Sequence, residues 1–192
     1  MPRLSLSDLY HLAIPADPRL HPGGGATAYV ITIADRESDE NRSELRLAAP
    51  GVEPRRLTGG PRDSSPRWSP DGGSPAFLRP VEGRPQLHLL PMDGGEPRVL
   101  TAAGPGGPAV WSPDGTRIAY GAPCGDPDRN APVVTDSLEY KAGGVGLLRG
   151  LTTHLFVVDV ATGETRRLTT GDFHAGEPSW SAWPAPPTRD TS

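Results

Sequence analysis

Serines beside glycines are the first residues to consider for chemistry, because a serine hydrolase holds its nucleophile in a Gly-x-Ser-x-Gly turn. That turn joins a strand to a helix and exposes the serine hydroxyl to the substrate. The nearest string in this sequence is Gly72-Gly73-Ser74-Pro75-Ala76, which lacks the final glycine and falls in an expected hairpin. The α/β core that would follow such a turn is missing from the 192 residues. We therefore assign no catalytic residue.

Histidines could act as bases or metal ligands, but none of them stands at a ligand spacing such as His-x-x-x-His. His88 and His154 lie in or beside expected strands, and we expect both to be hydrogen-bonded structural imidazoles rather than bases or ligands. The full set is far apart in the sequence: His11, His21, His88, His154 and His174.

Two further candidates lie after the second tryptophan repeat. Cys124 is the single cysteine, so it forms no intrachain disulfide, and no neighbouring cation favours its thiolate. The segment 126–130 has the carboxylates of a calcium loop, but Ala131 and Ser137 stand where that loop requires glycine and glutamate. We expect an unreactive thiol, no metal site and no cofactor.

The charge and hydropathy of the chain limit its partners. The formal net charge is −4, with acids and bases interspersed, which argues against a nucleic-acid or anionic-membrane surface. No stretch approaches the roughly 18 apolar residues that span a bilayer. The N-terminus has no apolar run of signal-peptide length. We expect a cytoplasmic protein with no nucleic-acid and no membrane partner.

An internal repeat organises the chain. The string WSPDG occurs at 68–72 and 111–115, and a third copy begins at Trp180 and breaks off after Ser181. Leu-Thr pairs mark a second common point in each unit, at 57–58, 100–101 and 168–169. The first two pairs are 43 residues apart and the last two are 68 apart, because about 25 residues are inserted after Tyr120.

Each unit predicts four short antiparallel strands. One ends on the tryptophan, the next follows the Asp-Gly turn, a third is apolar, and the last leads into Leu-Thr. Asp-Gly between apolar runs indicates a hairpin, because glycine accepts the positive φ of a tight turn. Only 5–13 shows a weak helical pattern, which Ser5 or Ser7 could cap. The expected second strands are 26–32, 74–78 and 116–120, and the expected third strands are 44–48, 86–90 and 154–160.

Four antiparallel strands every 43 residues are typical of a β-propeller blade. We predict an all-β fold, a partial β-propeller of about three four-stranded antiparallel blades, in which each tryptophan fills the wedge between neighbours. A β-sandwich with Trp68 and Trp111 as ordinary core residues is the alternative. The propeller would occupy 1–181, with blades at about 20–68, 69–111 and 112–180, an insertion at 124–150 and a disordered tail at 182–192.

The repeat resembles a known family. WSPDG, an Ala-(Tyr/Phe) strand, a D-x-x-Gly turn and Leu-Thr are shared by TolB-like proteins and the prolyl oligopeptidase family of serine peptidases. The segment 139–181 is similar to the acylaminoacyl-peptidase-like branch, where a Tyr-Gly-Gly insertion precedes an HLFVVD strand. The start of the chain resembles that branch too, with His21-Pro22-Gly23-Gly24 in place of Ser-Pro-Asp-Gly. The resemblance runs from about Leu6 to Ser181.

In that family a propeller of seven or eight blades precedes an α/β-hydrolase domain. The propeller restricts access, so that only short or unfolded peptides reach the catalytic residues. The resemblance therefore implies a non-catalytic propeller fragment that is inactive alone. Its partners in the intact parent would be its own catalytic domain or a peptide substrate. The alternative is a stand-alone TolB-like module for protein–protein interaction. A third possibility, that the chain is itself a hydrolase, lacks a nucleophile.

Three blades leave two blade faces uncovered, which could mediate self-association. The broken third WSPDG further predicts a truncated or frame-shifted reading of a longer gene, or a natural short form completed by oligomerisation. The insertion 124–150, with Tyr140 and Leu147-Leu148, is either a recognition surface or an outer-rim loop without a ligand.

Overall fold

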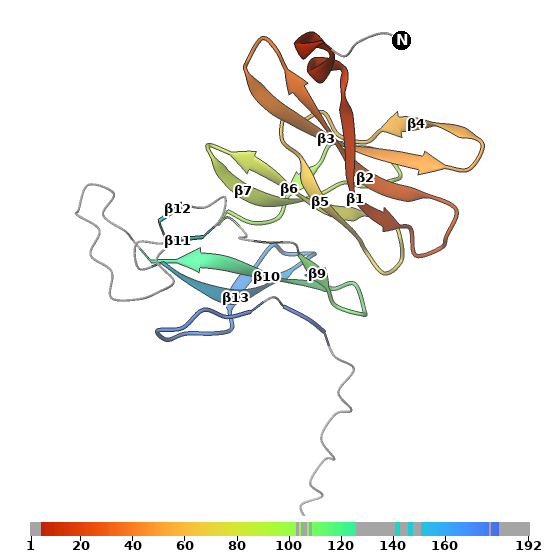
Figure 1. The fold of residues 1–192 in the computed structure, drawn as a ribbon. Helices are drawn as coiled ribbons and strands as arrows, with labels where there is room; N and C mark the ends of the chain where they lie inside the picture. Colours follow the sequence, from red (N-terminus) through yellow and green to blue (C-terminus); the bar gives the residue numbers. More distant parts are fainter. Residues whose placement is uncertain are drawn as a thin grey trace, which may run out of the picture.

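Three four-stranded antiparallel sheets make up most of the computed structural model, and the predicted all-β fold class is confirmed (Figure 1). The structure describes residues 5–102, 104, 107, 109–125, 141–142, 146–147, 151–176 and 178–180. Within each sheet the strands are neighbours in chain order.

The strands have these bounds. The first sheet contains β1 (Ala13–Leu20), β2 (Thr27–Asp35), β3 (Glu40–Ala49) and β4 (Val52–Arg56). The second contains β5 (Ser64–Trp68), β6 (Pro75–Val81), β7 (Arg84–Leu89) and β8 (Arg98–Val99). The third contains β9 (Val110–Trp111), β10 (Arg117–Cys124), β13 (Thr152–Asp159) and β14 (Thr165–Arg167). A small pair, β11 (Lys141–Ala142) and β12 (Gly146–Leu147), lies between β10 and β13 in the chain.

The tryptophan strand is the first strand of its sheet. Trp68 pairs with Pro75 across the hairpin, and Trp111 pairs with Ile118. The sequence placed each unit boundary directly after the tryptophan. The structure places it one strand earlier, because the strands on the two sides of the Asp-Gly turn pair with each other in one sheet. The sheets run over 13–56, 64–99 and 110–167. The expected tail 182–192 and most of the insertion 124–150 lie outside the described residues.

A short 3-10 helix, η1 (Leu6–His11), precedes the first sheet where the sequence predicted a capped turn. The backbone N–H of Ser5 donates to the side chain of Asp8 at 2.7 Å. This bond satisfies a donor at the start of the helix that has no partner within it.

The WSPDG string folds into the same hydrogen-bonded turn in both copies. Ser112 Oγ donates to Asp114 at 2.6 Å and accepts from the Arg117 N–H at 2.9 Å. The Ser112 hydroxyl, and then Thr116, lower the pKa of Asp114 to about 2. Gly115 has φ of 72°, a conformation that a residue with a Cβ adopts at a cost. The turn at 69–74 repeats this network.

The first unit keeps the turn without the aspartate, as the sequence predicted. The ring of His21 takes over, because its Nδ1 accepts from the Gly23 N–H at 3.0 Å. The Gly24 N–H donates to the His21 carbonyl at 2.8 Å. A histidine at the serine position thus closes the turn and also places a large ring beside the next sheet.

The Leu-Thr pairs close the outer edge of each sheet. In the second sheet, the Leu100 N–H donates to the Leu87 carbonyl at 2.8 Å, and the Leu87 N–H donates to Thr101 Oγ1 at 3.1 Å. A side-chain hydroxyl therefore continues the ladder where the fourth strand leaves the sheet. The same two bonds join Leu45 to Leu57-Thr58 and Leu155 to Leu168-Thr169.

The core lies between the sheets. Leu87 and Leu100 of the second sheet pack against Tyr120 and Val158 of the third, and each is at most 4 % exposed. Leu45 of the first sheet packs against Phe77 of the second, and both are fully buried. Burying such a side chain contributes about 1.5–3 kcal/mol, so stacking of neighbouring faces holds the sheets together.

Candidate functional site: the contacts between stacked sheets

Each tryptophan of the repeat joins its sheet to the one before it. The indole N–H of Trp111 donates to the carbonyl of Arg67 at 2.9 Å, and Arg67 directly precedes Trp68 on β5. Trp68 makes the same bond to Arg19 on β1 at 2.9 Å. Both indole rings are half-buried, so each ring fills space between two sheets while part of it stays exposed to solvent. The two tryptophans therefore make equivalent contacts with the sheet before them, as the propeller prediction requires.

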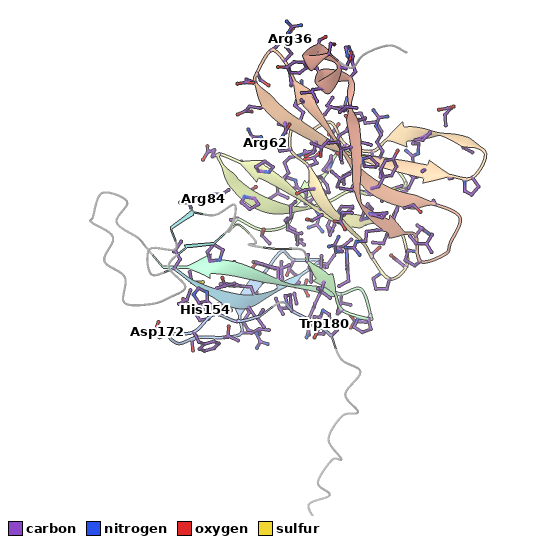
Figure 2. All side chains as sticks on the ribbon, viewed as in Figure 1. Arg36, Arg62, Arg84, His154, Asp172 and Trp180 are labelled. Carbon is purple, nitrogen blue, oxygen red and sulfur yellow. The ribbon has the colours of Figure 1, made fainter. Side chains whose placement is uncertain are left out.

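Trp180 extends this series by one step. Its indole N–H donates to the carbonyl of Val110 at 3.0 Å, and Val110 directly precedes Trp111 on β9. Figure 2 shows Trp180 beside the third sheet, on the side away from the other two sheets. Trp180 is 37 % exposed.

The first strands of the first two sheets are also joined by charge. Asp17 forms an ion pair with Arg19 at 2.6 Å and accepts a hydrogen bond from Arg67 at 2.9 Å. Asp17 has φ of 47°, and Ser65, at the same repeat position, has φ of 54°. Both residues lie at register shifts that mark bulges, which re-aim side chains of a strand. The repeated bulge directs Asp17 toward the neighbouring sheet.

A buried ion pair joins the segment that leads into β5 to the neighbouring strand β6 of the second sheet. Arg79 donates to both carboxylate oxygens of Asp63, at 2.7 and 2.8 Å, and Asp63 is fully buried. The pair raises the pKa of Arg79. The Gly60 N–H also donates to Asp63 at 3.1 Å. A Cβ on Gly60 would clash with both partners, so glycine is required there. Nothing in the sequence signalled this pair, because its members are not repeated.

The two strand histidines differ in their bonding. His154 is the expected structural imidazole, because Thr152 Oγ1 lies 3.0 Å from Nε2 and Thr169 Oγ1 lies 3.1 Å from Nδ1. Burial lowers its pKa. His88 is 4 % exposed beside Phe77, but neither ring nitrogen has a hydrogen-bond partner among the described residues. Burial, aided by Arg79, lowers the pKa of His88. The expected hydrogen bonding is therefore wrong for His88.

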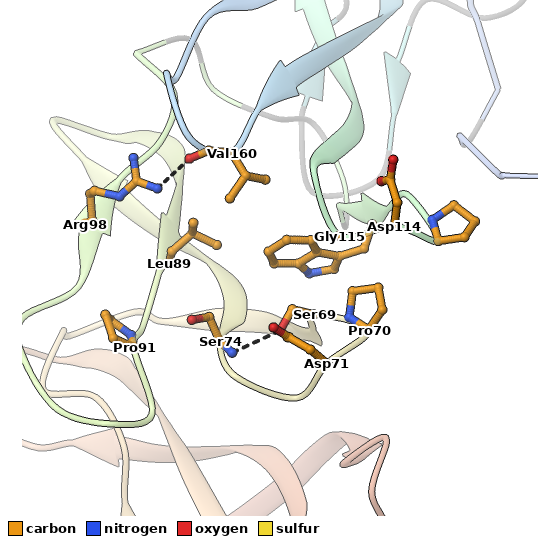
Figure 3. Close-up of a pocket in the computed structure, with 12 residues that line it drawn as sticks. Ser69, Pro70, Asp71, Ser74, Leu89, Pro91, Arg98, Asp114, Gly115 and Val160 are labelled. Carbon is orange, nitrogen blue, oxygen red and sulfur yellow. Dashed lines mark hydrogen bonds between the residues drawn. The ribbon is translucent and has the colours of Figure 1, made fainter.

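A groove of about 440 Å³ opens between the second and third sheets (Figure 3). Leu89, Trp111 and Val160 form its apolar walls, and the guanidinium of Arg98 donates to the Val160 carbonyl at 2.6 Å. Ser69 lies on its rim. The remaining lining residues come from the two WSPDG turns and from the turn after β7: Pro70, Asp71, Ser74, Pro91, Pro113, Asp114 and Gly115.

At the preceding junction, the ring of His21 lies beside the tryptophan. The His21 ring lies edge-on to Trp68, with centroids 4.7 Å apart, and its Nε2 is 3.2 Å from the Gly72 carbonyl. Ser69 stands at the equivalent position and has no ring. The repeat position that holds an imidazole ring at the first junction therefore holds a serine that lines the groove at the second.

The other residues singled out from the sequence do not form a reactive cluster in the part of the chain that the structure describes. The Ser74 N–H donates to Ser69 Oγ at 3.0 Å, so Ser74 belongs to the turn. Cys124 is half-buried, with Sγ 3.7 Å from the Ala122 carbonyl. The segment 126–130, with Ala131 and Ser137, lies outside the described residues.

Among the residues that the structure describes, no group of three or more histidine, cysteine, aspartate or glutamate side chains is placed to hold a metal ion. No described helix is long and apolar enough to cross a membrane.

Comparison by sequence finds a peptidase. The chain is 32 % identical over 208 aligned residues to the uncharacterized peptidase YuxL of Bacillus subtilis, and the match covers 93 % of the chain. The chain spans 29 % of the length of that relative. No family model matches the sequence.

Comparison by structure decides the architecture. The acylaminoacyl peptidase of Pyrococcus horikoshii matches 83 % of the chain with a TM-score of 0.71 and 21 % identity, over 25 % of its own length. The β-propeller domain of the Trilobed protease of Pyrococcus furiosus matches 81 % with a TM-score of 0.55 and 18 % identity, over 43 % of its length. The three sheets are blades of a β-propeller.

A TolB protein shares the same fold. The putative TolB of Agrobacterium tumefaciens matches 83 % of the chain with a TM-score of 0.53 and 22 % identity, over 47 % of its length. The predicted resemblance to the propeller part of prolyl oligopeptidase-type peptidases, with TolB-like repeats, is thus confirmed in sequence similarity and in fold.

Proposed function

We propose that this chain is the propeller portion of a serine peptidase and that it controls which peptides reach a separate hydrolase domain. The observation that carries the proposal is the match to a peptidase over 93 % of the chain and only 29 % of the relative. A propeller segment without a nucleophile elbow contributes shape and contacts rather than bond cleavage. The chain alone is then inactive, and its partners are a hydrolase domain and the peptide.

A chimera tests this role. The matching region of the YuxL peptidase is replaced by this chain, and short peptidyl anilides and a stably folded protein are offered to the chimera and to the unaltered relative. We expect both to cleave the anilides and to discriminate against the folded protein. A deletion variant of the relative, which lacks the region altogether, should lose that discrimination.

The isolated chain is the matching control. It should release no product from the anilides above the buffer rate. Hydrolysis by the isolated chain that disappears when one serine is replaced by alanine would show that the chain is itself an enzyme. A chimera that folds and cleaves the anilides but cleaves the folded protein as readily as the deletion variant does would contradict the access-control role.

A stand-alone interaction module is the second candidate, favoured by the likeness to TolB. Such a module has no hydrolase partner, so joining it to the hydrolase domain in the chimera should not support peptidase activity. A chimera that folds, as judged by circular dichroism, yet leaves the hydrolase domain inactive would favour the module over the peptidase portion.

A further inference from the structure

The groove between the second and third sheets is built from the same repeat positions as a contact that holds an aromatic ring at the preceding junction. There the His21 imidazole lies edge-on to the Trp68 indole, with ring centroids 4.7 Å apart. Its Nε2 is 3.2 Å from the Gly72 carbonyl. The residues at these three repeat positions one unit later all line the groove: Ser69, Trp111 and Gly115.

The His21 ring shows which hydrogen bonds such a place offers. Its Nδ1 accepts from the Gly23 N–H at 3.0 Å, so the ring proton is on Nε2, which donates to the Gly72 carbonyl. The turns of the second and third sheets have the same backbone conformation, since Gly72 has φ of 75° and Gly115 has φ of 72°. The Gly115 carbonyl is therefore directed toward the groove as the Gly72 carbonyl is directed toward His21.

No aromatic ring occupies the place next to Gly115 in the part of the chain that the structure describes. A Cβ built on Gly115 would find Pro70 Cδ as its nearest described atom beyond its chain neighbours, at 3.6 Å. A Cβ built on Gly72 would instead collide with the His21 ring. The groove thus combines an indole wall, an unfilled ring position and a backbone acceptor.

The two ends of the groove differ in charge (Figure 3). At one end lies the exposed guanidinium of Arg98, which donates to the Val160 carbonyl at 2.6 Å and forms no ion pair with a described residue. At the other end lie Asp71 and Asp114, whose turn hydroxyls lower the pKa of each carboxyl and keep both charged. An anionic group of a ligand is therefore attracted to Arg98 and repelled from the opposite end.

We propose that this groove binds the C-terminal residue of a peptide that ends in histidine. The imidazole lies edge-on to Trp111, as the His21 ring lies to its own tryptophan, and its N–H donates to the Gly115 carbonyl. The terminal carboxylate pairs with the remaining N–H groups of Arg98 in a charge-assisted bond. A few polar groups beside an apolar wall are enough to orient a small ligand. The two sheets form the site by themselves, so the inference stands whether or not the chain serves a peptidase.

A titration of the full chain tests the proposal. N-acetyl-glycyl-histidine is added to protein isotope-labelled at the indole nitrogens, with Trp111→Phe used to assign the signal. We expect a saturable shift of the Trp111 signal, while the Trp68 signal stays in place because His21 already lies against that ring. The same peptide with a C-terminal amide should bind about tenfold more weakly or worse, because it has no charge for Arg98. A peptide that ends in phenylalanine should bind at least about threefold more weakly, because its ring has no N–H for the Gly115 carbonyl.

Variants of the groove test the same contacts from the protein side. Arg98→Gln keeps a donor for the Val160 carbonyl but removes the charge, and it should weaken binding about tenfold or more. The double variant Ser69→His/Asp71→Gly rebuilds the His-Pro-Gly-Gly turn of the first unit, so the added ring should occupy the groove and abolish binding. Ser69→Ala/Asp71→Gly is the matched control, because it alters the same turn without adding a ring and should still bind. Circular dichroism checks that each variant is folded.

The proposal fails if the histidine peptide produces no saturable shift of the Trp111 signal. Unchanged affinity in Arg98→Gln, or equal affinity of the acid and the amide, would show that the carboxylate is not recognised at this end of the groove. Equal affinity of the phenylalanine peptide would remove the imidazole from the proposal. A folded Ser69→His/Asp71→Gly variant that binds as well as its alanine control would place the ligand outside the groove.

Discussion

Leu100 and Leu168 offer a matched test of what stabilises the sheets. Both are the leucine of a Leu-Thr pair, and each N–H donates to a third-strand leucine, at 2.8 and 2.7 Å. They differ in burial, at 4 % and 47 % exposed. Truncating a buried leucine to alanine costs about 2–5 kcal/mol through lost transfer energy and the cavity that remains. Leu100 packs between the second and third sheets, so we expect a cost of about 3 kcal/mol for Leu100→Ala.

Leu168→Ala removes the same atoms from a site that no described sheet covers. About half of the side chain is already in water, and no closed cavity forms, so the cost should stay below about 1 kcal/mol. The assay is urea unfolding followed by tryptophan fluorescence and circular dichroism, with both variants fitted to one m-value. Leu57→Ala serves as a control of intermediate burial. Equal costs for Leu100→Ala and Leu168→Ala would refute the reasoning, because the leucines would then act within their own sheets.

Four further outcomes follow from the junctions. Trp111→Phe removes one inter-sheet hydrogen bond and should cost about 0.5–1.5 kcal/mol in urea unfolding, and no change would mean that the bond is not formed. Asp63→Asn and Arg79→Met each break the buried pair and should each lower the free energy of unfolding by about 3–5 kcal/mol. The double variant should be less destabilised than the sum of the two single variants, and full additivity would contradict the pairing. His88 has a lowered pKa in the folded state, so its contribution to stability is complete above the unfolded value near 6.5 and falls as pH drops below it. Unfolding between pH 7 and 5 should therefore be less pH-dependent in His88→Phe, and an unchanged profile would argue against a buried neutral ring. The Asp114 carboxylate stabilises its turn at pH values above its unfolded pKa of 3.8, and this contribution is lost as pH falls toward about 2. The pKa of Asp114 can be measured by nuclear magnetic resonance titration, and an ordinary pKa would show that the turn is not formed.

Local chemistry made the fold predictable from the sequence. The WSPDG turn and the Leu-Thr pair close their hydrogen bonds within a few residues or across one hairpin, so their recurrence indicates a blade wherever they appear. The apolar third strand expected at 154–160 corresponds to β13 at Thr152–Asp159. The unit boundary was misplaced by one strand, because a repeat period fixes the spacing of sheets and leaves their starting strand undetermined.

Contacts outside the repeated motifs were harder to predict. Asp63 and Arg79 are 16 residues apart and occur once, so neither period nor motif points to them. The lack of a partner for His88 among the described residues depends on the whole surrounding junction. The open groove did leave a signal, since Ser69 stands where the first unit has His21. This difference between the units can be interpreted only from the structure, in which the His21 ring lies against Trp68.

The indole N–H of Trp111 gives the most direct test of the stacked sheets. Its bond to the Arg67 carbonyl joins two separate sheets and exists only if they are packed as described. Hydrogen exchange is measured by nuclear magnetic resonance on protein labelled at the indole nitrogens, with Trp111→Phe used to assign the signal. Stacking predicts that this N–H exchanges as slowly as the backbone amides of β10. Exchange at the rate of free indole, while the β10 amides remain protected, would show that the sheets form without stacking and would contradict the propeller account.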